Sequence, residues 1–287
     1  MKRRSFLKTV GRAGLAVGVT PAWGMHHVAE RQDPHPSSSD ARKEPEQASP
    51  ETILLKDYRP VSLYKIPISE VSRAKFPIID MHSHAYAKTP EEISEWVRNM
   101  DEVGIEKTII LTGATGQKFD DIHRKYAVYP SRFELWCGFD YTGYDKAGFG
   151  PQAIRELERC QQAGARGVGE LHDKGKGLVS STVNAFGMHP DDARMDSLFE
   201  RCGQLGMPVN IHVADPIWMY EPMDNRNDGL MNAFHWRLDN QPNIVGHSGM
   251  IDILERTVKK HSSTTFIACH FANLDYDLER LGKLLAR

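Results

Sequence analysis

Apolar residues follow two alternating patterns along the chain from residue 76 onward. Short runs rich in β-branched and aromatic residues alternate with longer stretches in which apolar residues recur at the helical spacing i, i+3 and i+4. The short runs predict six strands, at 76–82, 107–112, 133–139, 165–170, 208–213 and 264–270. The longer stretches predict six helices, at 90–103, 119–128, 151–163, 191–205, 248–261 and 275–286.

This alternation predicts an α/β fold in which helical crossovers join the strands of a parallel sheet. The pattern alone fits both a doubly wound open sheet and a (β/α)8 barrel of the TIM type. No GxGxxG motif follows the first strand, which removes the main reason to expect a dinucleotide-binding sheet. Polar residues at the predicted strand ends favour a barrel, whose chemistry gathers at the C-terminal mouth. These residues are His82, His84, Glu170, His212 and His270. We therefore expect a (β/α)8 barrel, of which about six βα units are present.

The first strand ends in two histidines with one residue between them, in IIDMHSH. Because strand side chains alternate faces, Asp80, His82 and His84 are expected on one face. The two imidazoles then lie about 7 Å apart along the strand. From there both can turn onto one divalent ion, with nitrogen contacts of about 2.0–2.1 Å. The alternative, two hydrogen-bonded histidines without a metal, stays open because this motif is short.

Four motifs occur in order, IIDMHSH, GARGVGE, PVNIHVADP and TTFIACHFAN. As a set they resemble the amidohydrolase superfamily of metal-dependent (β/α)8 enzymes, in particular its aminocarboxymuconate-semialdehyde decarboxylase-like branch. The resemblance runs from about Phe76 to the C-terminus. It implies metal ligands at His82, His84 and His212.

The same resemblance gives roles to two further residues. A histidine in the position of His270 is a ligand in binuclear members and an acid/base residue in mononuclear ones, and we expect His270 to be catalytic. Glu170 stands where binuclear relatives carry a carboxylate that bridges two metals. It is expected to be a metal ligand, or else to hold the tautomer of a neighbouring imidazole. Independently of the resemblance, Asp80, two residues before His82, is expected to orient the ligands or else to cap the strand end.

A three-histidine site predicts a bound divalent ion, with Zn²⁺ as the expected metal. Such an ion lowers the pKa of a bound water from 15.7 to about 7 and polarises a carbonyl group. The predicted function is metal-dependent hydrolysis of a C–N, ester or lactone bond in a small molecule. Two alternatives stay open, a non-oxidative decarboxylase of the same superfamily and a binding protein without catalysis.

The segment from Ala214 to Gly246 is far longer than ordinary βα connections of about 2–6 residues. It is expected to form a lid or a wall of the substrate pocket, although its aromatic residues could equally serve packing. The residues predicted to contact the substrate are His172, Trp218, Tyr220 and His247. Three other histidines, His123, His189 and His261, are expected at the surface.

The family also places an Asp at the end of strand eight, yet this chain stops after the sixth predicted helix. From Phe76 there are 212 residues, compared with about 250 in a typical barrel. We expect the barrel domain to occupy residues 53–287 with its C-terminal units missing. The edges of the first and sixth strands would then be unpaired.

The first residues predict an export signal rather than part of the fold. A basic cluster containing Arg3 and Arg4 precedes a weakly apolar stretch, and RRSFLK resembles the twin-arginine motif. Residues 1–28 are therefore predicted to be a twin-arginine-type signal peptide, which implies the twin-arginine export machinery and a periplasmic protein. Residues 29–52 lack Val, Ile, Leu, Met and aromatic residues and are predicted to be a disordered linker.

Composition excludes several other classes of protein. With 36 basic and 38 acidic residues and 40% hydrophobic residues, the chain has a globular composition and no excess charge to attract nucleic acid or an anionic membrane. No transmembrane span is expected in the mature protein. The four cysteines form no CxxC pair and are expected to be buried thiols. A homo-oligomer is compatible with the sequence.

Overall fold

The computed structural model of the protein describes residues 50–61, 70–71 and 73–286. They belong to one of the two units into which the chain divides, Glu46–Arg287. The predicted signal peptide, 1–28, and most of the predicted linker, 29–52, lie outside the described residues, so both stay predictions.

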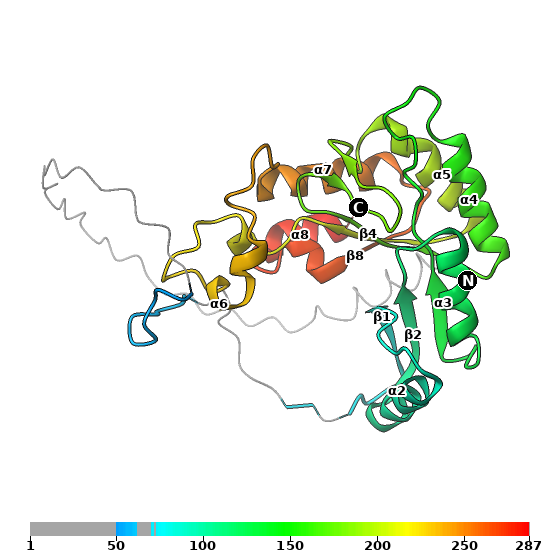
Figure 1. Ribbon diagram of the computed structural model, residues 1–287, viewed down its shortest axis with the longest axis horizontal. Coiled ribbons are helices and arrows are strands. Elements are labelled where there is room, and N and C mark those ends of the chain that lie inside the picture. The colour runs from blue at the N-terminus through cyan, green and yellow to red at the C-terminus, as the bar shows by residue number, and fades with distance from the viewer. Residues whose placement is uncertain (1–49, 62–69, 72, 287) are drawn as a thin grey trace, which may run out of the picture. The chain divides into compact units, whose positions relative to one another are not determined.

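Six parallel strands form the centre of the described chain, as the sequence predicted (Figure 1). One sheet contains β1 (Ile78–Ser83), β2 (Ile105–Leu111) and β3 (Phe133–Trp136). The other contains β4 (Val168–Asp173), β7 (Val209–Val213) and β8 (Phe266–Ala268). A parallel bridge between Cys137 and Val168 joins β3 to β4, so the spatial order follows the chain order. A doubly wound sheet reverses its order part-way, so this order is the arrangement of a barrel.

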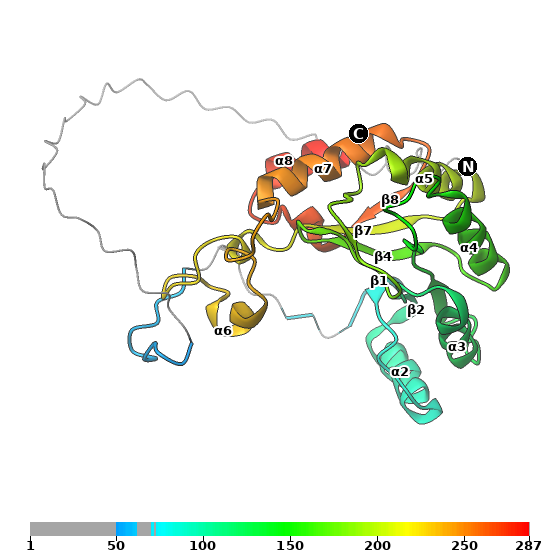
Figure 2. The same ribbon diagram turned by 45° about the horizontal axis from the view of Figure 1, so that its top comes forward.

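Six helices connect or follow these strands and agree with the predicted positions to within a few residues. They are α2 (Pro90–Val103), α3 (Gly116–Tyr126), α4 (Pro151–Gln162), α5 (Asp196–Leu205), α7 (His247–Lys260) and α8 (Leu278–Leu285). Helix α3 contacts α4, and α4 contacts α5, so successive helices lie side by side outside the strands (Figure 2). This is the outer helical layer that a (β/α) barrel requires.

The ends of α2 show how the sequence determines a helix. The Thr89 side chain accepts a hydrogen bond from the Glu92 backbone, and the Glu92 carboxylate accepts one from the Thr89 backbone, which together make a capping box. Pro90 occupies the first turn, where a missing N–H costs nothing. Gly104 ends the helix at φ 85°, a left-handed conformation that glycine adopts without strain.

The hydrophobic core lies between these helices and the outer faces of the strands. Ile110 of β2, Phe119 of α3 and Leu157 of α4 are almost completely buried within it. Burying one such side chain stabilises the fold by about 1.5–3 kcal/mol. All four cysteines are buried free thiols, as predicted.

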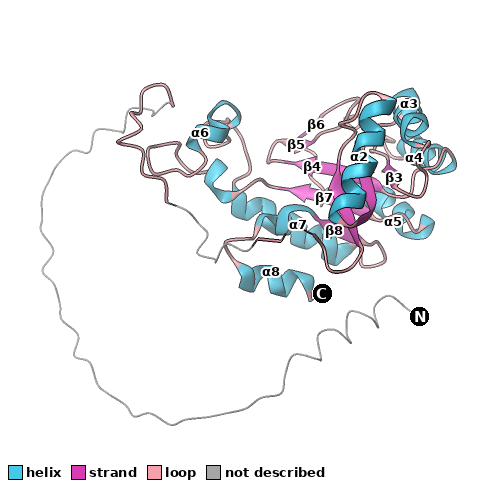
Figure 3. Ribbon diagram, turned by 90° about the horizontal axis from the view of Figure 1, so that it is seen from below, coloured by secondary structure: helices cyan, strands magenta, loops and turns pink. Residues whose placement is uncertain are grey.

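Two loops contain structure that the sequence did not predict. After β4, a short antiparallel hairpin pairs β5 (Gly177–Leu178) with β6 (Ala185–Phe186). The long segment 214–246, called the insertion below, contains η2 (Ile217–Met219), α6 (Leu230–Ala233) and η3 (Phe234–Trp236). Figure 3 shows α6 away from the strands. Ile53 and Tyr58 pack against a small separate core in the insertion, formed by Met219, Met223, Leu230, Ala233 and Leu238.

The two ends of the strand order are edges. Within the described residues β1 pairs only with β2, and β8 pairs only with β7, as predicted. Ile78 and Ile79 of β1 are consequently 45% and 52% exposed. None of the helices in the described part of the chain is long and apolar enough to cross a bilayer.

The predicted sixth strand is too long at its C-terminal end. It stops at Ala268, and the next segment is the 3-10 helix η4 (Cys269–Asn273). His270 has φ 51° and therefore leaves the extended conformation that a strand needs. The short helix η1 (Ala193–Met195) similarly replaces the beginning of the predicted helix 191–205.

The prediction that His189 and His261 lie at the surface was wrong. The His261 side chain is 3% exposed, and its ring packs at a tilt against that of Phe199, with the ring centroids 5.1 Å apart. His189 is mostly buried, and its Nδ1 lies 2.5 Å from Oδ2 of the buried Asp173. A ring contact thus holds His261 and a hydrogen bond to a buried carboxylate holds His189, and sequence spacing reveals neither partner.

Candidate metal centre

Four of the histidines predicted from the sequence converge at the C-terminal ends of the strands. His82 lies in β1, His84 immediately follows it, His212 lies in β7 and His270 lies in η4. The ring centroids of His82 and His84 are 5.3 Å apart, those of His82 and His270 4.9 Å, and those of His212 and His270 4.6 Å. Residues separated by up to 188 positions therefore meet in one cluster.

The carboxylate of Glu170, in β4, is the centre of this cluster. Its Oε2 lies 3.7 Å from His82 Nε2 and 3.4 Å from His84 Nε2. Its Oε1 lies within hydrogen-bonding distance of His212 Nδ1 and 3.9 Å from His270 Nε2. The Glu170 carboxylate belongs to two groups of possible metal ligands. One group also contains His82 and His84, and the other also contains His212 and His270. Within each group the ligand atoms lie within 4.8 Å of one another.

The hydrogen bond of His84 determines which of its nitrogens is free. Its Nδ1 lies 2.9 Å from the Leu111 carbonyl oxygen, which can only accept, so Nδ1 carries the proton. In the neutral ring Nε2 then presents a lone pair to the Glu170 carboxylate. Two lone pairs repel each other unless a cation lies between them. The donor set, imidazole nitrogens around a carboxylate, fits a divalent transition metal such as zinc.

Asp215, immediately after β7, joins the cluster from behind, and the sequence analysis missed it. His212 Nε2 lies 3.0 Å from Asp215 Oδ1. The other oxygen, Oδ2, lies 2.7 Å from Lys174 Nζ. The available signal was the position of this carboxylate, three residues after His212 in PVNIHVADP.

Burial and neighbouring charges set the protonation states of the cluster. Burial opposes ionisation of Glu170, but the His212 hydrogen bond and the surrounding imidazoles outweigh it and lower its pKa to about 2. Burial, together with nearby imidazoles, lowers the pKa of His270. Burial also lowers the pKa of His82, partly offset by Glu170. Burial also opposes protonation of His212, but its hydrogen bonds to Asp215 and Glu170 outweigh burial and raise its pKa. The site thus combines an ionised carboxylate with two imidazoles of lowered pKa, His82 and His270, and one of raised pKa, His212.

Comparison with known proteins agrees with this architecture. The amidohydrolase family model matches residues 79–287, which is most of the chain. The chain belongs to this amidohydrolase family. No curated protein is significantly similar to it in sequence.

Three solved structures are similar to this chain. A provisionally assigned amidohydrolase from Staphylococcus aureus is 16% identical, with 71% of each chain covered and a TM-score of 0.46. The 2,6-dihydroxybenzoate decarboxylase from Rhizobium is 17% identical over 71% of this chain and 70% of its own, with a TM-score of 0.43. The 4-oxalomesaconate hydratase from Rhodopseudomonas palustris is 13% identical over 73% and 68%, with a TM-score of 0.43. These similarities are too distant to indicate a substrate.

Two of the predicted substrate-contacting residues lie beside the cluster. The ring of His172, on β4, is 6.3 Å from that of His212, and burial lowers its pKa. The Tyr220 hydroxyl accepts a hydrogen bond from the Asp215 backbone and donates one to the Lys174 carbonyl oxygen. Burial raises the pKa of Tyr220 well above its ordinary value.

Two other predicted substrate contacts and Asp80 have structural partners. Trp218 packs closely against Gly229 at the edge of the core of the insertion. His247, the first residue of α7, is buried, and its Nε2 lies 3.1 Å from the Asn273 carbonyl oxygen. Asp80 Oδ1 accepts a hydrogen bond of 3.1 Å from the His82 backbone, so it orients the strand end that carries the first histidine.

The turn that carries His270 is left-handed at four successive residues, from His270 to Asn273. Each non-glycine residue in this conformation costs roughly 1–2 kcal/mol. The Asn273 side chain anchors the turn by donating to the carbonyl oxygens of Val213 and Ala214, at 3.2 and 3.1 Å. Because β7 carries His212, these bonds place His270 beside His212.

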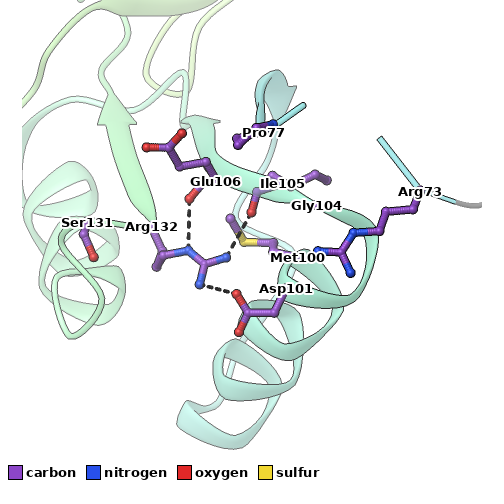
Figure 4. A pocket seen from close by; sticks show the side chains of 9 residues that line it. All are labelled: Arg73, Pro77, Met100, Asp101, Gly104, Ile105, Glu106, Ser131 and Arg132. Atoms are coloured by element: carbon purple, nitrogen blue, oxygen red, sulfur yellow. Dashed lines mark hydrogen bonds and ion pairs between the residues drawn. The ribbon is translucent and has the colours of Figure 1, made fainter. Parts of the chain in front are cut away.

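A pocket of about 460 Å³ lies at the opposite ends of the strands (Figure 4). It lies where α2 ends and β2 begins, at Gly104 and Ile105. Arg132 donates there to the Asp101 carboxylate and to the carbonyl oxygens of Ile105 and Glu106. These bonds tie β2 to the loop before β3, and the pocket contains none of the clustered histidines.

Proposed function

We propose that this protein is a metal-dependent hydrolase that acts on a C–N, ester or lactone bond of a small molecule. His82, His84, His212 and Glu170 would hold the ion. The observation that carries the proposal is the position of His84 Nε2, which faces the Glu170 carboxylate at 3.4 Å while Nδ1 donates to the Leu111 carbonyl oxygen. A cation held by both groups would remove the repulsion between the carboxylate and the Nε2 lone pair of the neutral ring.

When bound, a divalent ion would supply a water of lowered pKa and polarise a substrate carbonyl. His270 can exchange protons beside it. Its side chain is 49% exposed, so substrate and solvent can reach the ring, and burial of the remainder lowers its pKa. A neutral imidazole at neutral pH accepts a proton at Nε2 and returns it to a leaving group.

The identity of the metal and the location of the protein extend this proposal. Zinc suits a set of imidazole and carboxylate ligands. The RRSFLK motif and the basic N-terminus support twin-arginine export to the periplasm. Export of the folded protein would let the metal bind before translocation.

The test uses the full chain, purified and incubated with Zn²⁺. Metal content is measured after dialysis, and turnover is assayed with a panel of lactones, esters, amides and aromatic carboxylates, with CO₂ release measured separately. His84→Ala and His212→Ala are expected to lose bound metal and turnover together. His235→Ala is the matched control, because this histidine is exposed in η3, outside the cluster.

Each outcome of this test has a distinct meaning. Hydrolysis that depends on the metal supports the proposal, whereas CO₂ release without hydrolysis would replace it with the decarboxylase alternative. A wild-type chain that retains no metal, or a His84→Ala variant with full activity, would overturn it.

A further inference from the structure

We propose that Asp215 is the positioning residue that selects the metal-binding nitrogen of His212. By accepting a hydrogen bond from Nε2, it leaves the Nδ1 lone pair for the ion. This inference rests on the proposed function above and goes beyond it, because it assigns a role and a coordinating atom that the histidine motifs do not define.

The two nitrogens of His212 face different carboxylates. Nε2 lies 3.0 Å from Asp215 Oδ1, and Nδ1 faces Glu170 Oε1 within hydrogen-bonding distance. A neutral imidazole has one N–H and one lone pair, and a carboxylate can only accept. Since Glu170 also faces His82 and His84, the ion belongs on the Nδ1 side. The N–H must therefore point to Asp215.

Asp215 is held rigidly enough to impose this choice. It is 5% exposed, and its Oδ2 lies 2.7 Å from Lys174 Nζ. Its backbone N–H donates to the Tyr220 hydroxyl, at 3.3 Å, and that hydroxyl donates to the Lys174 carbonyl oxygen, at 3.0 Å. A closed ring of contacts thus joins the end of β4 to the beginning of the insertion behind His212.

Lys174 completes the arrangement electrostatically. A buried carboxylate near Glu170 would be unfavourable without a compensating cation. The Lys174 ammonium supplies that charge while its own side chain remains 43% exposed to solvent. Carboxylates that orient metal-bound histidines typically contribute about 10–100-fold to metal affinity.

The experiment measures the affinity of the whole protein for Zn²⁺ and Co²⁺ by competition with a chelator. Asp215→Ala is expected to weaken binding about 10–100-fold. Asp215→Asn is expected to weaken it less, because the amide oxygen can still accept from Nε2. Asp145→Asn is the control, since Asp145 is exposed and lies outside the cluster. Circular dichroism checks that each variant is folded. If Asp215→Ala does not fold, the affinity of the nearly isosteric Asp215→Asn variant decides the question.

Proton NMR of the Co²⁺ protein reports the nitrogen directly. Each histidine ligand is expected to contribute one hyperfine-shifted, exchangeable imidazole proton, and hydrogen bonds protect two of these from exchange, His84 Nδ1–H and His212 Nε2–H. Asp215→Ala should lose only the signal of His212, so His84 serves as the internal reference. Unchanged metal affinity in folded Asp215 variants, or retention of both signals, would overturn the inference alone. A wild-type chain that binds neither ion would instead overturn the proposed function.

Discussion

The left-handed turn at His270 depends on one side chain, that of Asn273, and removing it is a quantitative test of the fold at the site. Asn273 is 2% exposed and has φ 52°. In Asn273→Ala, the carbonyl oxygens of Val213 and Ala214 lose the donors now at 3.2 and 3.1 Å. Each buried acceptor left unsatisfied costs about 1–3 kcal/mol.

The backbone adds a second cost that can be separated from the first. Alanine at a left-handed position costs about 1 kcal/mol more than asparagine or glycine, which adopt it readily. We therefore expect Asn273→Ala to lower the free energy of unfolding by about 4 kcal/mol. Asn273→Gly also loses the hydrogen bonds, but glycine adopts the left-handed conformation without strain. This variant should therefore lower the free energy of unfolding by about 3 kcal/mol.

The measurement is equilibrium unfolding in urea, followed by circular dichroism and tryptophan fluorescence. Turnover should fall in both variants, since the turn places His270, the proposed proton-exchanging residue, beside His212. An Asn273→Ala variant within about 0.5 kcal/mol of wild type would refute the anchoring role. Equal losses in the Ala and Gly variants would refute the contribution of the backbone.

Three further predictions concern packing, helix stability and pH. In Gly167→Ala the new Cβ would lie 2.4 Å from the buried Trp136 ring. The free energy of unfolding, measured in urea, should therefore fall by about 1–3 kcal/mol. A variant as stable as wild type would contradict this contact. Gly282 lies inside α8, and nothing lies within 4 Å of the Cβ that alanine would add. Gly282→Ala should therefore raise the free energy of unfolding by about 0.5–1 kcal/mol in the same assay. A lower free energy of unfolding would instead show a steric clash. The hydrogen bond to Asp173 raises the pKa of His189, so its stabilisation is fully present below the unfolded pKa of about 6.5 and is lost as pH rises through the higher folded pKa. The difference in unfolding free energy between wild type and His189→Gln should therefore shrink as pH rises, and a pH-independent difference would disprove the linkage.

The sequence by itself determined the elements of this protein and the residues that end its strands. Periodicity located all six main strands and six helices, because side chains repeat every 2 residues in a strand and every 3.6 in a helix. It also selected His82, His84, Glu170 and His212, since polar residues at the C-terminal ends of parallel strands face a common mouth. These inferences need only neighbours along the chain.

Only the tertiary structure decided how those residues meet. The proton on His84 depends on a carbonyl group 27 positions away, and the carboxylate of Glu170 meets His212 across 42 positions. The role of Asp215 depends on Lys174, and the left-handed turn at His270 is held by bonds to the end of β7. Hydrogen bonds act over about 3 Å in space, whatever the separation along the chain. Spacing in the sequence can therefore predict which candidate residues lie at one end of a barrel. Only the folded structure determines which of their atoms face each other.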